Sequence, residues 1–299
     1  MSNIAILIPS FNSRATIGGT LASLVAQQSL DSVRAVYLAD DCSTDDTVAT
    51  ASRSWSAPFA LQIVTRKSNV GERCNVSEAI HKLPSDIQWV LLLHSDDIAK
   101  PNWVVTMADQ IRKCEDSVAT ICCSWDVLQP SGYLDPGEDV PLRPVQLIHG
   151  DCESVRGTLL RGCWWHISGC AIRVSAFRDT GDFQSDFPQL GDWEWLLRCL
   201  ERGWCVEYVP RTLIVYRSHS ESVSSASFRT HRDIDEALRI VCAYKRYLGV
   251  RDLARFHVKR LGYLVRRIAS SLLTLQVGRA FLALRLMGTI PVNLVRSLR

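Results

Sequence analysis

The first 125 residues alternate at short intervals between apolar, β-branched runs and amphipathic helical patterns. The apolar runs predict strands at 4–8, 35–39, 61–64, 89–93 and 118–124, and the segments between them predict helices at 15–28, 45–54, 72–82 and 102–113. Parallel strands need a helical crossover between them, so this order predicts an α/β fold with a mostly parallel, Rossmann-like sheet and helices on both faces.

The second half of the chain is less regular. Residues 129–150 form a loop rich in Pro and Gly, and we expect a strand at 164–173, a helix at 193–202, a strand pair at 206–216 around Pro210, and a polar loop at 218–227. Beyond this loop, leucines recur at helical spacing among Arg and Lys residues. We therefore expect one domain at 1–228, with halves at 1–125 and 126–228, and a basic amphipathic helical tail at 229–299.

The charge is unevenly distributed, although the net charge is only +3. The tail at 229–299 holds 15 Lys and Arg against 4 Asp and Glu, whereas residues 1–228 hold 19 against 27. This surplus predicts an anionic partner, and an anionic membrane surface fits the apolar stripes of the tail. No nucleic-acid-binding module is visible there, so nucleic acid is not an expected partner.

The sequence favours a cytoplasmic location. The longest uncharged stretch of the tail, at 268–278, has 11 residues, against the ~20 that a membrane-spanning helix needs. The start of the chain lacks a cleavable signal, and the eleven cysteines show neither CxxC pairs nor zinc-finger spacing. We expect a cytoplasmic protein. The tail either attaches peripherally to the inner face of the membrane or packs against the domain with its basic face in solvent.

Four polar segments follow the predicted strands of the first half. They are Pro9-Ser10-Phe11-Asn12, Asp40–Thr47, Arg66–Gly71 and His94-Ser95-Asp96-Asp97. Because the carboxyl ends of parallel strands meet at one edge of a sheet, and ligands bind at that edge, we expect these segments to share a cleft. Pro9 cannot donate a ladder hydrogen bond, so the first strand should end there.

The Asp96-Asp97 pair carries the clearest chemical signal. Two adjacent carboxylates repel each other unless a cation or hydrogen-bond donors compensate, and a divalent metal carrying a diphosphate would do so. The alternative is a solvated turn whose Asp residues stabilise a helix start. Capping alone would likewise explain Ser43, Thr44 and Asp45, but it leaves unexplained why a strand runs directly into Asp40-Asp41.

These motifs resemble those of a known family. The order Pro-x-Phe-Asn, Asp-Asp-x-Ser-Thr-Asp-x-Thr, Asn-x-Gly and x-x-Asp-Asp-x-x-x-Pro is similar to that of family 2 glycosyltransferases, which have the GT-A fold. The resemblance covers roughly 3–225 and continues in Gly181-Asp182-Phe183, Gly191-Asp192-Trp193-Glu194 and Tyr216-Arg217-Ser218-His219.

The resemblance implies a role for each matching position. The implied donor-binding residues are Pro9, Ser10, Phe11, Asn12, Asp41, Arg66, Asn69, His94, Ser95, Asp96 and Arg217. The implied metal ligands for Mg²⁺ or Mn²⁺ are Asp96, Asp97 and His219. Asp192 matches the base that activates the acceptor, and Glu194 is a rival. Trp164, Trp165 and Trp193 could form an acceptor platform, with core packing as the alternative. His94 departs from the family pattern, which has an acid there, and histidine favours softer metals than Mg²⁺.

The implied reaction moves a sugar from a nucleotide-diphosphate sugar to a glycan or lipid-linked acceptor in bacterial surface polysaccharide synthesis. One base without a covalent nucleophile implies inversion at the anomeric carbon. The alternatives are a sugar nucleotidyltransferase, whose Gly-rich basic loop after the first strand is poorly matched in this chain, and a non-catalytic sugar-binding protein on the same fold. A dinucleotide oxidoreductase is disfavoured because no GxGxxG follows the first strand.

Overall fold

A computed structural model describes residues 3–140, 142–220 and 222–298 of the chain. They divide into two compact units. The N-terminal unit comprises residues up to 151 together with 165–218. The C-terminal unit comprises 152–164 and the chain from 219 onward.

A ten-stranded sheet forms the centre of the N-terminal unit, counted over its described residues. The parallel strands, in spatial order, are β3 (Leu61–Thr65), β2 (Val33–Asp40), β1 (Ile4–Ser10), β4 (Trp89–Leu92), β6 (Val118–Leu128) and β10 (Cys205–Arg217). The strands running the other way are β9 (Ala171–Arg173), inserted between β4 and β6, and the short β5 (Ile98–Ala99), β7 (Leu134–Asp135) and β8 (Gln146–Ile148). The predicted α/β class is confirmed, and the sheet is mixed because these short segments return antiparallel.

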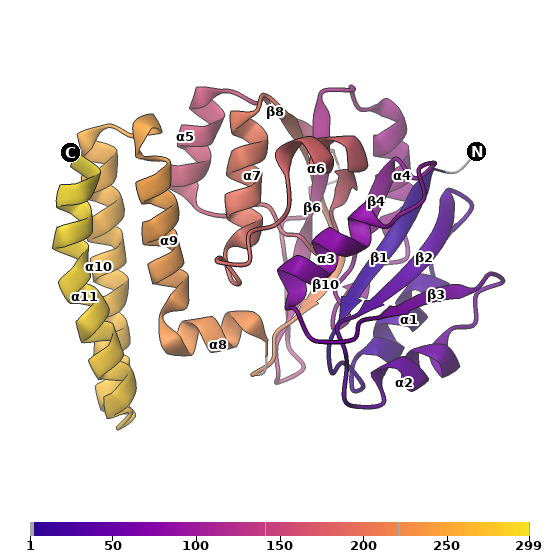
Figure 1. Ribbon diagram of the computed structural model, residues 1–299, viewed down its shortest axis with the longest axis horizontal. Helices are drawn as coiled ribbons and strands as arrows, with labels where there is room; N and C mark the ends of the chain where they lie inside the picture. The colour runs from indigo at the N-terminus through magenta and orange to yellow at the C-terminus, as the bar shows by residue number, and fades with distance from the viewer. Residues whose placement is uncertain (1–2, 141, 221, 299) are drawn as a thin grey trace. The chain divides into compact units, whose positions relative to one another are not determined.

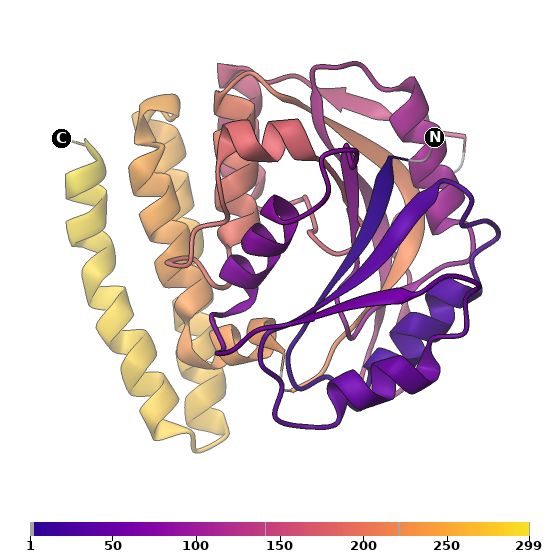
Figure 2. The ribbon, with the colours of Figure 1, turned by 45° about the vertical axis from the view of Figure 1, so that its right-hand side comes forward.

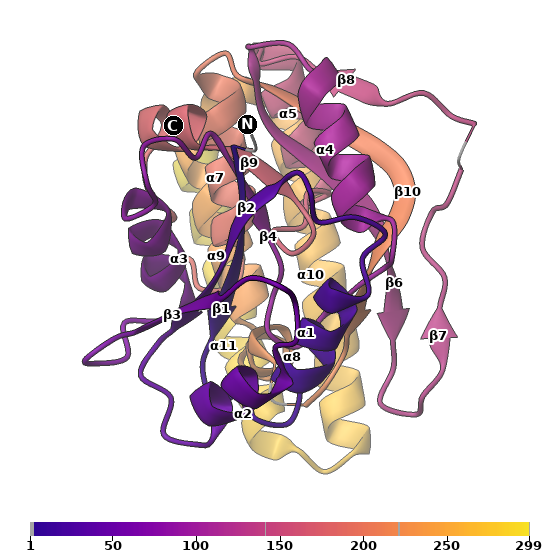
Figure 3. The same cartoon turned by 90° about the vertical axis from the view of Figure 1, so that its right-hand side faces the viewer.

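Helices cover both faces of the sheet, as predicted (Figures 2 and 3). One face carries α1 (Ile17–Val25), α2 (Thr47–Ser54) and α4 (Trp103–Lys113), and the other carries α3 (Glu72–His81), α6 (Val174–Thr180) and α7 (Gly191–Glu201). Side chains of a strand alternate between faces, so Ile4, Ile6 and Ile8 of β1 pack in one core with Leu21 of α1 and Trp103 of α4.

The strand β1 does not end at Pro9, contrary to the sequence prediction. Pro9 pairs in register with Ala39, and Ser10 pairs with Asp40, whereas the last β1–β4 pair is Leu7 with Leu92. The Ser10 carbonyl accepts a hydrogen bond from the Asp41 N–H on the β2 side. Because neighbouring residues face opposite sides, the Pro9 nitrogen faces the side where β4 has already ended, so its missing donor costs nothing.

Two predictions for the second half were wrong in detail. Only Ala171–Arg173 of the predicted strand 164–173 is extended, because Gly169 turns the chain with a φ of +90° close to the Ile214 side chain. The predicted strand pair around Pro210 is the single strand β10, whose register against β6 shifts between Val209 and Thr212. The helix α6 was not predicted.

The C-terminal unit is helical, as predicted for the tail. It contains α5 (Cys152–Arg161), α8 (Val223–Thr230), α9 (Arg232–Ala243), η1 (Lys245–Tyr247), α10 (Val250–Leu273) and α11 (Val277–Leu298). Two of these were not expected: α5, and α8, which begins inside the predicted polar loop. The helices α10 and α11 run side by side as an antiparallel hairpin (Figure 1). None of the described helices has both the length and the apolar composition needed to cross a membrane.

The leucines of α10 are divided between the interior of the unit and its surface. Leu253 and Leu264 are buried, whereas Leu261 and Leu272 are exposed. The helix therefore has one apolar face packed within the unit and a second apolar face at its surface.

Candidate active site

The loops after β1 and β2 are tied together by side-chain hydrogen bonds. The Asn12 N–H donates to Ser43 Oγ at 2.9 Å, and Asn12 Oδ1 accepts from the Thr44 N–H at 2.8 Å. Asp40 is buried and accepts from the Ser43 N–H at 3.1 Å. Ser43 and Thr44 therefore join two loops and do not cap α2, whose N-cap residue is Asp46.

Asp41 joins the loop after β2 to the loop after β3. Its buried carboxylate accepts from the Val70 N–H at 2.9 Å and from the Gly71 N–H at 2.8 Å, and Arg66 Nε lies 3.8 Å away. Gly71 has a φ of +84°, a conformation that favours glycine. The Gly71 N–H is shared with Asn69 Oδ1 at 3.0 Å, so the donor-binding positions predicted in these two loops are brought together.

Arg66 lines a pocket of about 390 Å³ at the carboxyl end of β3. Its guanidinium donates to Asn75 Oδ1 and to Glu78 Oε2, both at 2.7 Å on α3. The pocket lining includes neither Asp96 nor Asp192, so this pocket and the acidic residues after β4 are separate features of the unit.

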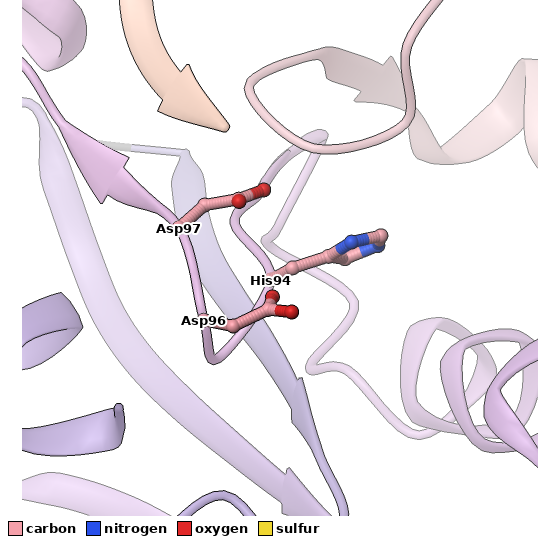
Figure 4. Close-up of side chains that lie close together, drawn as sticks. All are labelled: His94, Asp96 and Asp97. Carbon is pink, nitrogen blue, oxygen red and sulfur yellow. The ribbon is translucent and has the colours of Figure 1, made fainter. Parts of the chain in front are cut away.

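His94, Asp96 and Asp97 form a cluster after β4. Their candidate ligand atoms lie within 4.8 Å of one another, and Figure 4 shows the three side chains leaving the loop toward one side. Asp97 Oδ1 accepts from the Arg217 N–H at 3.0 Å, and Arg217 Nε donates to the Asp96 carbonyl at 2.9 Å. Ser95 lies between His94 and Asp96 in the sequence, and its hydroxyl is hydrogen-bonded to the Ser13 hydroxyl at 2.6 Å.

The cluster is electrostatically unusual. Burial of Asp97 and the adjacent charge of Asp96 raise the pKa of Asp97 to about 7, against the opposing charge of His94. Burial lowers the pKa of His94, but the Glu72 carboxylate and the charges of Asp97 and Asp96 outweigh it and raise this pKa to about 9. Negative charge is thus crowded around the cluster, and His94 compensates part of it.

The cluster fits a divalent cation. Asp97 Oδ2 is buried and has no hydrogen-bond partner within the described residues, which is unfavourable unless something else binds that oxygen. Carboxylate oxygens suit hard divalent ions such as Mg²⁺ and Mn²⁺, whereas an imidazole nitrogen suits softer ions. His219, also predicted as a ligand, belongs to the C-terminal unit, so that assignment stays a prediction.

Asp192 lies in the first turn of α7. Its Oδ1 accepts from the Trp193 N–H at 2.8 Å, and Arg73 Nη2 lies 4.0 Å from it. The rival base Glu194 is buried and binds Arg198 Nε at 2.8 and 3.0 Å. Glu194 is therefore committed to an ion pair inside the unit, whereas Asp192 keeps part of its side chain accessible.

The predicted aromatic platform is not supported. Trp165 and Trp193 are each 1% exposed, and Trp165 stacks on Trp195 with ring centroids 5.6 Å apart. A ring without an exposed face cannot stack on a sugar, so the packing alternative holds for both. Trp164 is partly buried in the C-terminal unit, where its indole N–H donates to Thr158 Oγ1 at 3.1 Å.

Three charged or polar residues near these groups were missed by the sequence analysis. Glu72 and Arg73 begin α3, and Ser168 Oγ accepts from the His94 N–H at 3.0 Å. The only signal for the first two was their place directly after the Asn-x-Gly motif. A charged pair at a helix start is usually solvated, so this place alone gave no reason to single them out.

Comparison with known proteins identifies the fold and the domain. Residues 5–138 match the model of glycosyl transferase family 2. A relative from Haemophilus influenzae, described as an uncharacterized glycosyltransferase, is 24% identical over 240 residues, which cover 78% of this chain and 74% of the relative.

Two solved structures share the fold. S. aureus TarS 1-349 in complex with UDP-GlcNAc has a TM-score of 0.62 at 16% identity, over 81% of this chain and 66% of that chain, just under two thirds of its length. The mannosyltransferase PcManGT from Pyrobaculum calidifontis, in complex with GDP-Man and Mn²⁺, has a TM-score of 0.60 at 16% identity, over 99% and 86% of the two chains. The sequence match is therefore to a glycosyl transferase family 2 domain at residues 5–138, and the shared architecture shows that the chain has the GT-A fold.

Proposed function

We propose that the protein transfers a sugar from a nucleoside-diphosphate sugar to a hydroxyl group of a glycan or lipid-linked acceptor. The observation that carries the proposal is the His94–Asp96–Asp97 cluster, with its unpartnered Asp97 oxygen, at the carboxyl end of β4 inside the matched domain. The structural neighbours with UDP-GlcNAc and GDP-Man support this donor class.

Asp96 and Asp97, with His94, would hold Mg²⁺ or Mn²⁺. A bound divalent ion supplies positive charge against the negative charge that grows on the departing diphosphate. The protein's own part is to keep the two carboxylates together, and the Arg217 N–H and the Thr20 hydroxyl do this by binding Asp97 at its side chain and at its carbonyl. Arg217, from the closing Tyr-Arg-x-His motif, is thus close enough to serve the donor as well.

The nucleoside would bind where the loops after β1, β2 and β3 meet. Asp41 holds the backbone of Val70 and Gly71 and has oxygen lone pairs left for a base N–H or a ribose hydroxyl. Phe11 is 46% exposed beside these loops, which leaves a face of its ring for a base.

Asp192 would act as the general base that takes the proton from the attacking hydroxyl. Such a step contributes about 10²–10⁴-fold to the rate. Glu194 is buried and its carboxylate is bound by Arg198, so an acceptor hydroxyl has little access to it, whereas the side chain of Asp192 is partly exposed. A single base without a covalent nucleophile gives inversion at the anomeric carbon.

The test begins with the donor. Thermal unfolding of the purified protein with UDP-, GDP-, dTDP- and CMP-sugars, with and without Mn²⁺, should show one nucleotide class that stabilises the protein only when Mn²⁺ is present. A ligand at 100 times its Kd adds about 2.7 kcal/mol. Release of nucleoside diphosphate from that donor should then fall about 10²–10⁴-fold in Asp192→Asn. Full activity of this variant would exclude Asp192 as the base.

The second apolar face of α10 supports attachment of the enzyme to a membrane surface, where a lipid-linked acceptor would lie. Its exposed apolar residues are Val258, Leu261, Val265 and Leu272, and its exposed basic residues are Arg255, Lys259 and Arg266. An apolar stripe flanked by positive charge fits an anionic bilayer surface, which would bring the enzyme to a lipid-linked acceptor on the cytoplasmic side.

Vesicle flotation tests this attachment. The protein should bind phosphatidylglycerol vesicles, and it should bind phosphatidylcholine vesicles much less. Val265→Asp should abolish binding, and 0.5 M salt should weaken it because surface charges are then screened. Equal binding to both vesicle types would contradict the charge argument, and no binding to either would exclude membrane attachment by α10.

A further inference from the structure

Glu72 and Arg73 are adjacent on the first turn of α3, yet their side chains reach two different parts of the site. Glu72 Oε1 lies 3.2 Å from His94 Nε2, at the metal-binding end. Arg73 Nη2 lies 4.0 Å from Asp192 Oδ1, at the end of the proposed base. Arg73 Nη1 lies 3.7 Å from Glu72 Oε1, so the four residues form a continuous row of alternating charge.

This row is buried where its charges meet. Arg73 is 7% exposed, and the Oε1 atom of Glu72 is buried. The Glu72 carboxylate lies between two basic side chains, with its Oε1 3.7 Å from Arg73 Nη1 and 3.2 Å from His94 Nε2. Buried ion pairs add little net stability, because desolvation offsets most of the attraction. Stability alone is therefore a weak reason for four charges in one row.

Arg73 also holds the backbone that carries Asp192. Its Nη2 lies 3.4 Å from the carbonyls of both Pro188 and Gln189, just before α7 begins. Gly191, the first residue of α7, leaves room for this contact, since a Cβ there would lie 3.0 Å from Arg73 Nε and 3.3 Å from Arg73 Cδ. Only a planar guanidinium has enough donors in fixed directions to contact these carbonyls and both carboxylates.

We propose that Glu72 and Arg73 are positioning residues: Glu72 orients His94 toward the metal, and Arg73 fixes Asp192 relative to it. The proposal rests on the proposed function, in which both ends of the row take part in sugar transfer. A rigid first turn of α3 would set the separation between metal and base, and a misplacement of about 1 Å is enough to cost about 100-fold in rate. Glu72 would act on the metal through the ring of His94, as carboxylates commonly do on metal-binding histidines.

The Arg73 half is tested by Arg73→Lys, with Arg198→Lys as the matched control. Arg198 is also a partly buried arginine with a carboxylate partner and two backbone carbonyl acceptors, but it contacts neither end of the row. With release of nucleoside diphosphate as the assay, Arg73→Lys should lower kcat about 10–100-fold and leave the donor KM within about 3-fold. Arg198→Lys should lower the Tm to a similar extent with little effect on kcat.

A double-mutant cycle separates positioning from general damage. If Arg73 acts through Asp192, then Arg73→Lys should have little further effect on kcat in the Asp192→Asn background. An equal fall in kcat in both backgrounds, or a kcat no lower than that of Arg198→Lys, would overturn this half of the proposal.

The Glu72 half has a readout that needs no turnover. Glu72→Gln should weaken binding of Mn²⁺ alone, followed by electron paramagnetic resonance, by about 10–100-fold, while Arg73→Lys should leave it within about 2-fold. Unchanged Mn²⁺ affinity in Glu72→Gln would overturn the role of Glu72. Absence of any donor turnover by the unaltered protein would instead count against the proposed function, and the Mn²⁺ titration would still decide the role of Glu72.

Discussion

The same dipeptide, Asp-Asp, follows two strands of the sheet and meets two different environments. After β2, Asp40 binds the backbone and hydroxyl of Ser43, and Asp41 binds two backbone N–H groups of the loop after β3. After β4, Asp97 receives one backbone N–H, and its second oxygen is buried without a hydrogen-bond partner in the described part of the chain.

This difference separates a pair that joins loops from a pair suited to a cation. Hydrogen-bond donors from neighbouring loops neutralise the first pair, so it joins those loops and keeps the edge of the sheet in shape. In the second pair, His94, Ser168 and the Arg217 N–H offset the negative charge of Asp97 only in part, so this pair is suited to a cation. Burial alone does not distinguish them, since Asp41 and Asp97 are both buried.

The largest effect is expected from a substitution in the second pair. Asp97→Asn should weaken Mn²⁺ binding and slow donor turnover by more than about 100-fold, since changes to residues behind the metal ligands already cost about 10–100-fold. Without metal, its free energy of unfolding should not fall, because the repulsion with Asp96 is removed. Mn²⁺ titration and urea unfolding check both statements, and wild-type Mn²⁺ affinity in this variant would contradict the contrast between the pairs.

The reverse pattern is expected for the first pair. Asp41→Ala leaves the Val70 and Gly71 N–H groups without their acceptor and should lower the free energy of unfolding by about 2–3 kcal/mol. Binding of Mn²⁺ alone should stay within about 3-fold of the wild type. A loss of Mn²⁺ affinity as large as in Asp97→Asn would mean that both pairs serve the metal.

A third carboxylate extends the comparison, because Asp126 is in direct contact with a lysine. Its Oδ2 lies 2.6 Å from Lys100 Nζ, and its Oδ1 accepts from the Gly137 N–H at 2.9 Å. Burial raises the pKa of Asp126, but Lys100 and the Gly137 N–H hold it below its usual value. A lowered carboxyl pKa stabilises the fold above the unfolded pKa of about 3.9, and this contribution is lost as the pH falls.

Asp126→Asn should therefore lower the free energy of unfolding by about 1–2 kcal/mol at pH 7. The difference from the wild type should shrink as the pH is lowered to about 3, below the unfolded pKa of about 3.9. Urea unfolding at both pH values measures it, and a difference that grows toward low pH would contradict a lowered pKa for Asp126 in the folded protein.

The smallest effect on the free energy of unfolding is expected for Ser43, whose hydroxyl bonds to Asp40 of the first pair. Ser43→Ala removes the hydroxyl that bonds to Asp40 and accepts from the Asn12 N–H, and it should lower the free energy of unfolding by about 1 kcal/mol. Ser52→Ala, at an exposed position of α2, is the control and should change it by less than about 0.5 kcal/mol. Equal effects of the two variants would show that the Ser43 hydroxyl adds nothing.

The sequence analysis predicted correctly those elements that are determined by residues adjacent in the chain. Strands β1 to β4 are apolar runs between strong helical patterns, so their order and their polar ends could be deduced from the chain alone. The segment 164–173 was predicted wrongly because its apolar residues suggest a strand, while Gly169, at a positive φ, breaks it. Hydrophobicity does not report backbone conformation, and nothing next to this glycine indicated its φ.

The roles of Glu72 and Arg73 could not be predicted for another reason. Arg73 contacts Pro188, which lies 115 residues away in the chain, and the two meet only because α3 and α7 cover the same face of the sheet. By local criteria the two charges look like a solvated helix start. Their burial follows from tertiary packing, which neither periodicity nor motif spacing reports.

β1 pairs with β2 over more residues than with β4, and this difference limits which insertions the site can tolerate. β1 and β2 stay paired for three residues past the last β1–β4 pair, which corresponds to about 10 Å of strand at the rim of the sheet. This offset between the strand ends depends on the number of residues in each strand and not on their side chains. One residue inserted into β4 would advance Asp96 and Asp97 by about 3.3 Å and turn them to the opposite face, so strand length is under stricter constraint than composition at this rim.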